Sequence, residues 1–230
     1  ADYWIFKLDG DGKKLWDKCF GGSGADTLLD LYPTSDGGYI LGGISPSPAD
    51  GNKGVASNGN MDYWVLKLDG NGDKIWEESF GGTGGDFLYR LKQTSDGGYI
   101  LGGTSGSAPG GNKESVNYGG NDYWVLKLND EGTKVWEMSF GGSGSDTLVS
   151  LDETSDGGFI LGGYSDSGAD GNKTIGTFGF FDYWVIKIVP GEPVAVITMT
   201  PESPVVNQPV AFSAADSFHW NTNRSIVAYE

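Results

Sequence analysis

The chain has 230 residues, 40 of them glycine, with 13% aromatic residues and a formal net charge of −16. This charge argues against nucleic acid as a partner, because phosphate binding needs clustered Lys and Arg, and the glycines lack the triplet period of collagen. No apolar run approaches the roughly 20 residues of a membrane helix, so we expect no membrane insertion in this fragment. Glycine with this many aromatic residues favours short strands joined by tight turns.

A 60-residue repeat dominates the sequence. The units cover residues 1–60, 61–120 and 121–180, and a partial unit covers 181–188. Each unit contains Asp-Tyr-Trp, Phe-Gly-Gly, Ser-Asp-Gly-Gly and Gly-Asn-Lys motifs. They start at Asp2, Asp62, Asp122 and Asp182; at Phe20, Phe80 and Phe140; at Ser35, Ser95 and Ser155; and at Gly51, Gly111 and Gly171. Because even the loops keep their length, we expect them to be packed or to bind a ligand.

Each unit predicts four strands and almost no helix. In the second unit the strands are 63–69, 74–80, 87–94 and 99–104. Asp96-Gly97 predicts a two-residue hairpin turn, since both residues tolerate the positive φ angles of such a turn. Four antiparallel strands repeated at fixed length are typical of a β-propeller blade. A parallel β-helix is the competing fold, but its rungs are shorter and lack two hairpins per unit.

These motifs carry a family resemblance over residues 1–188. The segments Asp62–Trp76, Phe80–Gly82 and Thr94–Gly103 resemble repeats of large secreted bacterial and archaeal surface proteins, which are usually predicted to be β-propellers. The resemblance implies that the Asp-Gly-Gly hairpin joins the two inner strands of a blade. The chain would then open with the outer half of one blade and end its repeats on the third strand of another.

The tail differs in composition from the repeats. Residues 189–193 predict a linker. Residues 194–230 resemble the first strands of a PKD-type immunoglobulin-like β-sandwich, which would be truncated here. Such domains are similar to spacers and adhesion modules of surface proteins, so this resemblance implies an extracellular or cell-surface location.

Residues for catalysis are scarce. His219 is the only histidine, so the repeats carry no Ser-His-Asp or Cys-His constellation and no histidine-based zinc site. Carboxylates are plentiful, but they recur with the 60-residue unit, whereas an active site usually combines non-equivalent positions. We therefore expect no enzyme in this fragment. Cys19 occupies the position of Ser79 and Ser139, so it is expected to fill a serine-sized slot.

Calcium is the only cofactor that the sequence suggests. The turn that starts at Asp69 matches the beginning of a calcium loop but lacks its later glycine and glutamate, so a plain hairpin turn is expected there. The Gly-Asn-Lys loops offer candidate calcium ligands, which are Asp50, Asn52, Asp170 and Asn172. The alternative is that the asparagines cap turns.

Charged residues within the strands are expected to be structural. Four lysines lie mid-strand among apolar neighbours, where a buried ammonium needs a partner. They are Lys7, Lys67, Lys127 and Lys187, and the repeated Asp26, Asp86 and Asp146 are their expected partners. The repeated Trp16, Trp76 and Trp136 are expected to pack between blades.

Three functions stay open at this point. The first is an extracellular structural or adhesive module, whose partners are other repeats of the same protein or another chain that completes the ring. The second is a carbohydrate-binding module for surface polysaccharide, using loop aromatics. These are Tyr118, Phe178, Phe180 and Phe181. The third is a non-catalytic accessory region of a secreted hydrolase.

Overall fold

The computed structural model describes residues 1–189, 198–200 and 211–213, and within them it contains strands and no helix. Two complete antiparallel sheets have four strands each in sequence order. The first comprises β3 (Thr27–Pro33), β4 (Tyr39–Ser45), β5 (Asp62–Leu68) and β6 (Lys74–Phe80). The second comprises β7 (Asp86–Gln93), β8 (Tyr99–Ser105), β9 (Asp122–Leu128) and β10 (Lys134–Phe140). The prediction of four-stranded all-β units is confirmed.

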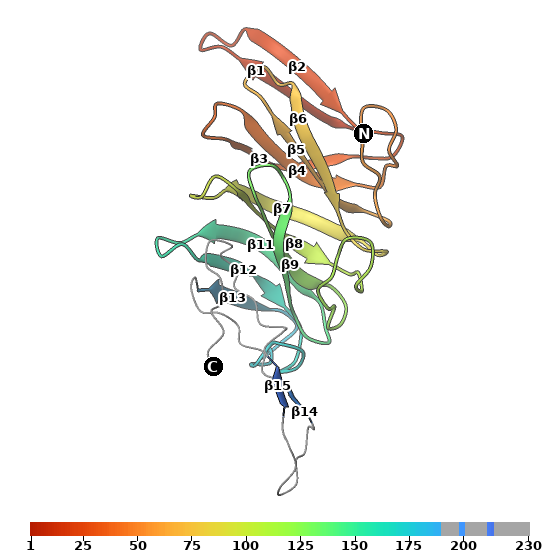
Figure 1. The fold of residues 1–230 in the computed structure, drawn as a ribbon, viewed down its shortest axis with the longest axis vertical. Coiled ribbons are helices and arrows are strands. Elements are labelled where there is room, and N and C mark those ends of the chain that lie inside the picture. The colour runs from red at the N-terminus through yellow and green to blue at the C-terminus, as the bar shows by residue number, and fades with distance from the viewer. Residues whose placement is uncertain (190–197, 201–210, 214–230) are drawn as a thin grey trace, which may run out of the picture.

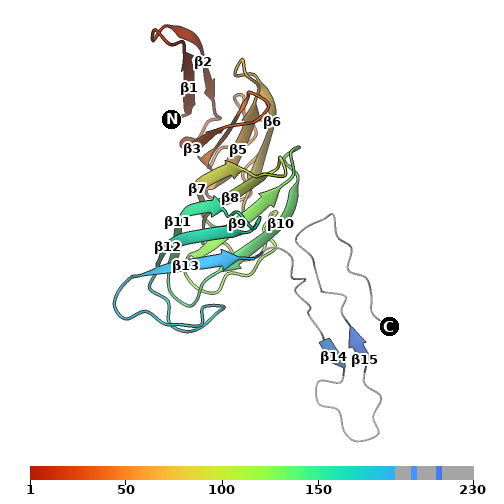
Figure 2. The ribbon, with the colours of Figure 1, turned by 90° about the vertical axis from the view of Figure 1, so that its left-hand side faces the viewer.

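Incomplete sheets flank the two complete ones. The hairpin of β1 (Tyr3–Leu8) and β2 (Lys14–Phe20) precedes them, and the sheet of β11 (Asp146–Glu153), β12 (Phe159–Ser165) and β13 (Asp182–Ile188) follows them. The four sheets stack in sequence order, with β1–β2 and β13 at opposite ends (Figures 1 and 2). A two-stranded hairpin at the start and a three-stranded sheet at the end agree with the strand grouping that the family resemblance implies.

The predicted tail domain lies almost wholly outside the described residues. Of residues 189–230 the structure describes Val189 and an antiparallel pair, β14 (Thr198–Thr200) and β15 (Ala211–Ser213).

The Ser-Asp-Gly-Gly hairpin differs in detail from its prediction. Instead of a two-residue turn, Gly97 N donates to Thr94 O and Thr94 N donates to Gly98 O, so the loop has three residues. Gly97 takes φ +88°, the left-handed conformation that closes such a loop. Asp96 Oδ1 accepts from Thr94 Oγ1 at 2.5 Å and from Gly98 N at 3.0 Å. The aspartate therefore fixes the turn through its side chain.

The hydrophobic core lies between neighbouring sheets. β5 and β9 are buried along their whole length because each is sandwiched by sheets on both faces. One apolar cluster joins the first and second complete sheets, where Tyr63 and Val65 pack with Leu88, Leu91 and Trp124. Since each core needs two sheets, the stability of every sheet depends on its neighbours.

Candidate interaction surfaces

The tyrosine of each Asp-Tyr-Trp motif joins one sheet to the next. Tyr3 Oη donates to the carbonyl of Trp64 at 3.0 Å, and the two rings lie 4.6 Å apart. Tyr63 repeats the arrangement on Trp124, at 3.1 Å and 4.8 Å. Tyr123 repeats it on Trp184, at 3.0 Å and 5.0 Å. We call this contact the Tyr–Trp joint; it occurs at all three sheet junctions.

The paired glycines of the fourth strand make room for the neighbouring sheet. A Cβ on Gly102 would lie 2.7 Å from Leu151 Cδ1 and 3.1 Å from Leu148 Cδ2, both from the next sheet. At Gly162, in the last sheet, a Cβ would meet only Ser150 Cβ at 3.8 Å. Leu148 and Leu151 fill the space beside Gly102, whereas the equivalent space beside Gly162 is open.

The two ends of the stack expose the two halves of a Tyr–Trp joint. Tyr183, the last tyrosine of the series, is 95% exposed, and its neighbour Val185 is also exposed. At the other end Trp4 is 64% exposed, next to exposed Phe6 and Leu8. We call these surfaces the β13 face and the β1 face. Each is an apolar surface of a kind that the inner sheets bury.

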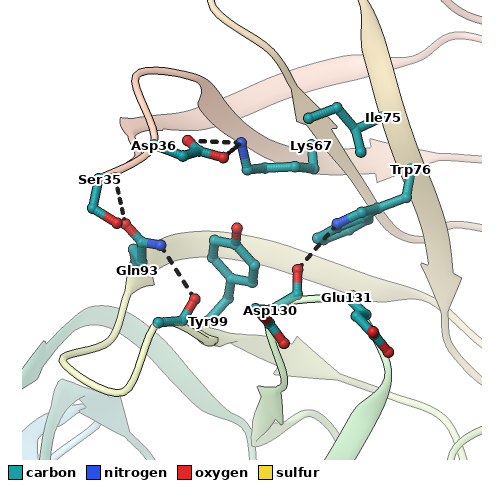
Figure 3. Close-up of a pocket in the computed structure, with 10 residues that line it drawn as sticks. Ser35, Asp36, Lys67, Ile75, Trp76, Gln93, Tyr99, Asp130 and Glu131 are labelled. Atoms are coloured by element: carbon teal, nitrogen blue, oxygen red, sulfur yellow. Dashed lines mark hydrogen bonds and ion pairs between the residues drawn. The ribbon is translucent and has the colours of Figure 1, made fainter.

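A cleft of about 370 Å³ opens between the two complete sheets (Figure 3). Trp76 lies on one side and Tyr99 on the other, with ring centroids 5.7 Å apart. Trp76 Nε1 donates to Asp130 O at 3.3 Å, and a Cβ on Gly132 would lie 2.9 Å from the indole. The indole therefore packs on the turn of the next sheet, as the repeat pattern predicts for these tryptophans.

The contacts of Lys67, which lies in the same cleft, differ from the predicted lysine–aspartate pairs. Its Nζ pairs with Asp36 Oδ2 at 2.8 Å, and Lys127 likewise pairs with Asp96 at 3.0 Å. The expected partners Asp26, Asp86 and Asp146 are therefore wrong. Lys67 pairs with Asp36 because the loop between β3 and β4, which carries Asp36, lies beside the neighbouring strand β5, which carries Lys67. Lys7 Nζ donates to the carbonyl of Gly70 at 3.4 Å.

Asp26, Asp86 and Asp146 instead hold loops of their own sheets. Asp86 Oδ2 accepts from Gly82 N at 2.9 Å and from Ser107 Oγ at 2.8 Å. Asp26 and Asp146 make the corresponding bonds to Ser47 and Ser167. These aspartates therefore tie the Phe-Gly-Gly link to the loop that follows the fourth strand.

The Gly-Asn-Lys loops fold back onto the Phe-Gly-Gly link. Asn52 Oδ1 accepts from Gly21 N at 2.8 Å, and its Nδ2 donates to Cys19 O at 2.8 Å. Asn172 makes the same two bonds to the third link. Asp50 accepts from Ser23 N in the first link at 2.8 Å, and Asp170 accepts from Ser143 N in the third link at 2.9 Å. The four calcium candidates thus accept hydrogen bonds from N–H groups of the Phe-Gly-Gly links, which lie about 30 residues earlier in the chain.

The lysine of the same motif was missed from the sequence. Lys53, Lys113 and Lys173 are buried and lie 5.6, 5.7 and 5.8 Å from the ring centroids of Trp64, Trp124 and Trp184. Lys53 Nζ donates to Ser47 O at 3.0 Å and to Val55 O at 2.6 Å, and burial lowers its pKa. The sequence signal that could have identified these lysines is that a lysine follows Gly-Asn at the same position of all three units.

Three of the four candidate loop aromatics lie in the loop that precedes β13. Phe178 is 96% exposed and Phe180 is 91% exposed, and Phe181 is also exposed. Tyr118, at the equivalent position of the second unit, is less exposed, at 37%, and a Cβ on Gly171 of the next unit would lie 3.0 Å from its Cβ. Phe178 lines a cleft of about 410 Å³ with Tyr183 and Trp184.

Among the residues that the structure describes, no three His, Cys, Asp or Glu side chains are grouped so that they could hold a metal ion. Within the same residues no helix is long and apolar enough to cross a membrane. In comparisons with known proteins, no family model and no curated protein matches this chain.

Proposed function

We propose that this chain is a structural or adhesive repeat module of an extracellular surface protein, which works by stacking against further blades of the same kind. The observation that carries the proposal is the Tyr–Trp joint. Three copies are made within the chain, and the two free halves of a fourth, Tyr183 and Trp4, are exposed at its ends. A neighbouring blade with the same structure would supply a tryptophan for Tyr183 at one end and a tyrosine for Trp4 at the other.

The open space at Gly162 supports the same partner. In the inner junction the corresponding Gly102 receives Leu148 and Leu151 from the next sheet. A further blade would bring equivalent leucines to Gly162. Stacking continued in this way leads to a closed β-propeller ring, which usually has four to eight blades.

Sedimentation velocity of the 230-residue chain tests the proposal. We expect concentration-dependent association, because the β13 face of one copy fits the β1 face of another, and this head-to-tail contact leaves new faces at both ends. Tyr183→Ser combined with Gly162→Val should abolish it, since the first removes half of the joint and the second fills the leucine space. Ile75→Ser, which removes an exposed apolar residue away from both end faces, is the control.

A compact monomer that binds no hydrophobic dye at any concentration would contradict this function. Association that survives the Tyr183/Gly162 double variant would contradict the proposed faces.

A second candidate function is carbohydrate binding, which the exposed Phe178 and Phe180 favour because sugars stack on exposed aromatic rings. The test is calorimetric titration with soluble polysaccharides, using Phe178→Ala and Phe180→Ala. Binding that disappears in both variants while association is unchanged would support this function over stacking.

A further inference from the structure

The last sheet has an open edge at β13. In the complete sheets β5 pairs with β4 on one side and β6 on the other, and β9 pairs with β8 and β10. The sequence of β13 differs from that of β5 and β9 at two positions, yet within the described residues β13 pairs only with β12. An unpaired strand edge offers N–H and C=O groups to another extended chain.

In the complete sheets a glutamate of the fourth strand also binds the loop that precedes the third strand. Glu77 Oε1 accepts from Gly54 N at 2.9 Å. In the next unit Glu137 Oε1 accepts from Glu114 N at 2.8 Å and from Ser115 N at 2.5 Å. The Glu77 and Glu137 side chains are only 9% and 6% exposed. The fourth strand is therefore held by a buried carboxylate as well as by its main chain.

A lysine three residues before each glutamate makes a second contact with the same loop. Lys74 Nζ donates to Asn52 O at 2.7 Å, and Lys134 Nζ donates to Asn112 O at 2.7 Å. Each lysine also forms an ion pair with the glutamate of its own strand. Asn172 holds the same position in the third unit, and within the described residues no lysine reaches its carbonyl.

The loop of the third unit presents the same donors without the glutamate. Thr174 and Ile175 take the places of Glu114 and Ser115, and in the described part of the chain their N–H groups have no acceptor. The Ile175 side chain is 70% exposed, whereas Val55 at the same place of the first unit is half-buried. The surface that the fourth strand covers in two units is therefore open in the third.

The cleft of about 410 Å³ lies at this place. Thr174 and Trp184 line it, and Trp184 corresponds to Trp64, whose Nε1 donates to Glu77 Oε2 at 3.0 Å. The cleft is thus bounded by the groups that bind the glutamate in the first complete sheet.

The charge of the cleft also fits a carboxylate. In the second unit burial lowers the pKa of Lys113, and the negative charge of Glu137 opposes this shift. Lys173, the equivalent lysine, is buried and lines the cleft. No carboxylate of the described residues forms an ion pair with it. A glutamate in the cleft would supply the missing negative charge near this ammonium.

The tail does not carry the matching sequence. Residues 189–230 contain no lysine, so they lack the pair of lysine and glutamate three residues apart. The fourth strands β2, β6 and β10 are each paired within their own sheets.

We propose that the open edge of β13 and the loop at Thr174 bind an extended strand from another unit of this repeat, which is recognised by a lysine and a glutamate three residues apart. This site goes beyond the stacking proposed above, because it uses the edge of β13, whereas stacking uses its face. The bound strand would complete the last sheet in the register of β6 on β5.

Fluorescence anisotropy of a labelled peptide with the sequence of residues 73–81 tests the proposal, with the 230-residue chain kept below the concentrations at which it associates. We expect saturable binding of one peptide per chain. Glu77→Gln in the peptide should weaken binding by about tenfold or more, because it removes a charged acceptor. Glu78→Gln is the matched control, since it removes the same charge but Glu78 has no ion pair or hydrogen bond among the described residues.

Two variants of the chain locate the bound peptide. Thr174→Pro removes the N–H group that corresponds to the donors Gly54 N and Glu114 N, and it should weaken binding of the unaltered peptide. Gly162→Val lies on β12 and fills the space used in stacking, so it should bind the peptide as wild type does. If Thr174→Pro does not fold, the two peptide variants still decide the outcome.

A peptide that does not bind would overturn the proposal. Equal loss of binding with Glu77→Gln and Glu78→Gln would also overturn it, because overall charge would then govern recognition. Peptide binding by a chain that stays monomeric at every concentration would support this site and contradict stacking.

Discussion

Tyr63 Oη donates a hydrogen bond to the main-chain carbonyl of Trp124, which lies 61 residues later in the chain, at 3.1 Å. Both residues are fully buried, and their rings pack 4.8 Å apart. The bond repeats almost unchanged at Tyr3 and Tyr123. One tyrosine thus links the backbone of two sheets and explains why consecutive units hold a fixed spacing.

Replacing Tyr63 by Phe tests the hydrogen bond alone. The variant keeps the ring but leaves the buried carbonyl of Trp124 without this donor, so we expect a loss of about 1–2 kcal/mol in the free energy of unfolding. Tyr183→Phe is the control, because the Tyr183 side chain is exposed in the same motif. Urea denaturation measures both; equal effects would show that the bond does not contribute.

The ion pair of Lys67 and Asp36 predicts an asymmetry between otherwise equivalent positions. The side chain of Lys67 is 4% exposed, whereas that of Lys187, which pairs with Asp156, is 34% exposed. Asp36→Asn removes the negative charge that balances a buried ammonium and leaves it with neutral acceptors such as Leu68 O, so it should cost about 1–2 kcal/mol. Asp156→Asn should leave thermal stability unchanged, since water replaces the lost partner of Lys187.

The same ion pair predicts a dependence on pH. The hydrogen bond from Lys67, with those from Thr34 and Gly38, holds the pKa of Asp36 well below its usual range. In the unfolded chain the Asp36 carboxylate is protonated near the ordinary aspartate pKa of about 3.9, whereas in the folded chain it stays ionised at that pH. The stabilisation is therefore complete above about pH 5 and is lost as the pH falls toward the folded-state pKa.

Urea midpoints of wild type and Asp36→Asn, measured between pH 7 and pH 3, test this sign. The difference between the two proteins should narrow as the pH falls below about 4. A difference that stays constant over the whole range would contradict the role of Asp36 ionisation.

The glycines of β8 and β12 predict opposite responses to alanine. Gly102→Ala pushes a methyl group toward Leu148 and Leu151 and should cost about 1–3 kcal/mol. Gly162→Ala meets only Ser150 Cβ at 3.8 Å, so the isolated chain should be as stable as wild type or more stable by about 0.5–1 kcal/mol. Calorimetric melting temperatures compare the two variants. Equal destabilisation would show that Gly162 is covered in solution.

The sequence by itself determined the strands and their grouping. Alternating strand and turn signals at a 60-residue period specify four antiparallel strands, because Gly72 and Gly97 permit backbone turns that other residues resist. The same periodicity predicted that Trp76 packs between sheets. These are local or periodic properties, which a single chain displays directly.

Only the tertiary structure decided which charges meet. Along the chain Lys67 lies 41 residues from Asp26, 19 residues from Asp86 and 31 residues from Asp36, its partner in the structure. Sequence separation therefore does not indicate which of the three aspartates pairs with Lys67. The choice follows from the register of β4 against β5, which places the β3–β4 turn beside Lys67. Likewise Asp62 and Asp86 converge because strand starts of adjacent sheets meet at Gly81. Contacts between sheets depend on how the sheets pack, and no local pattern encodes that geometry.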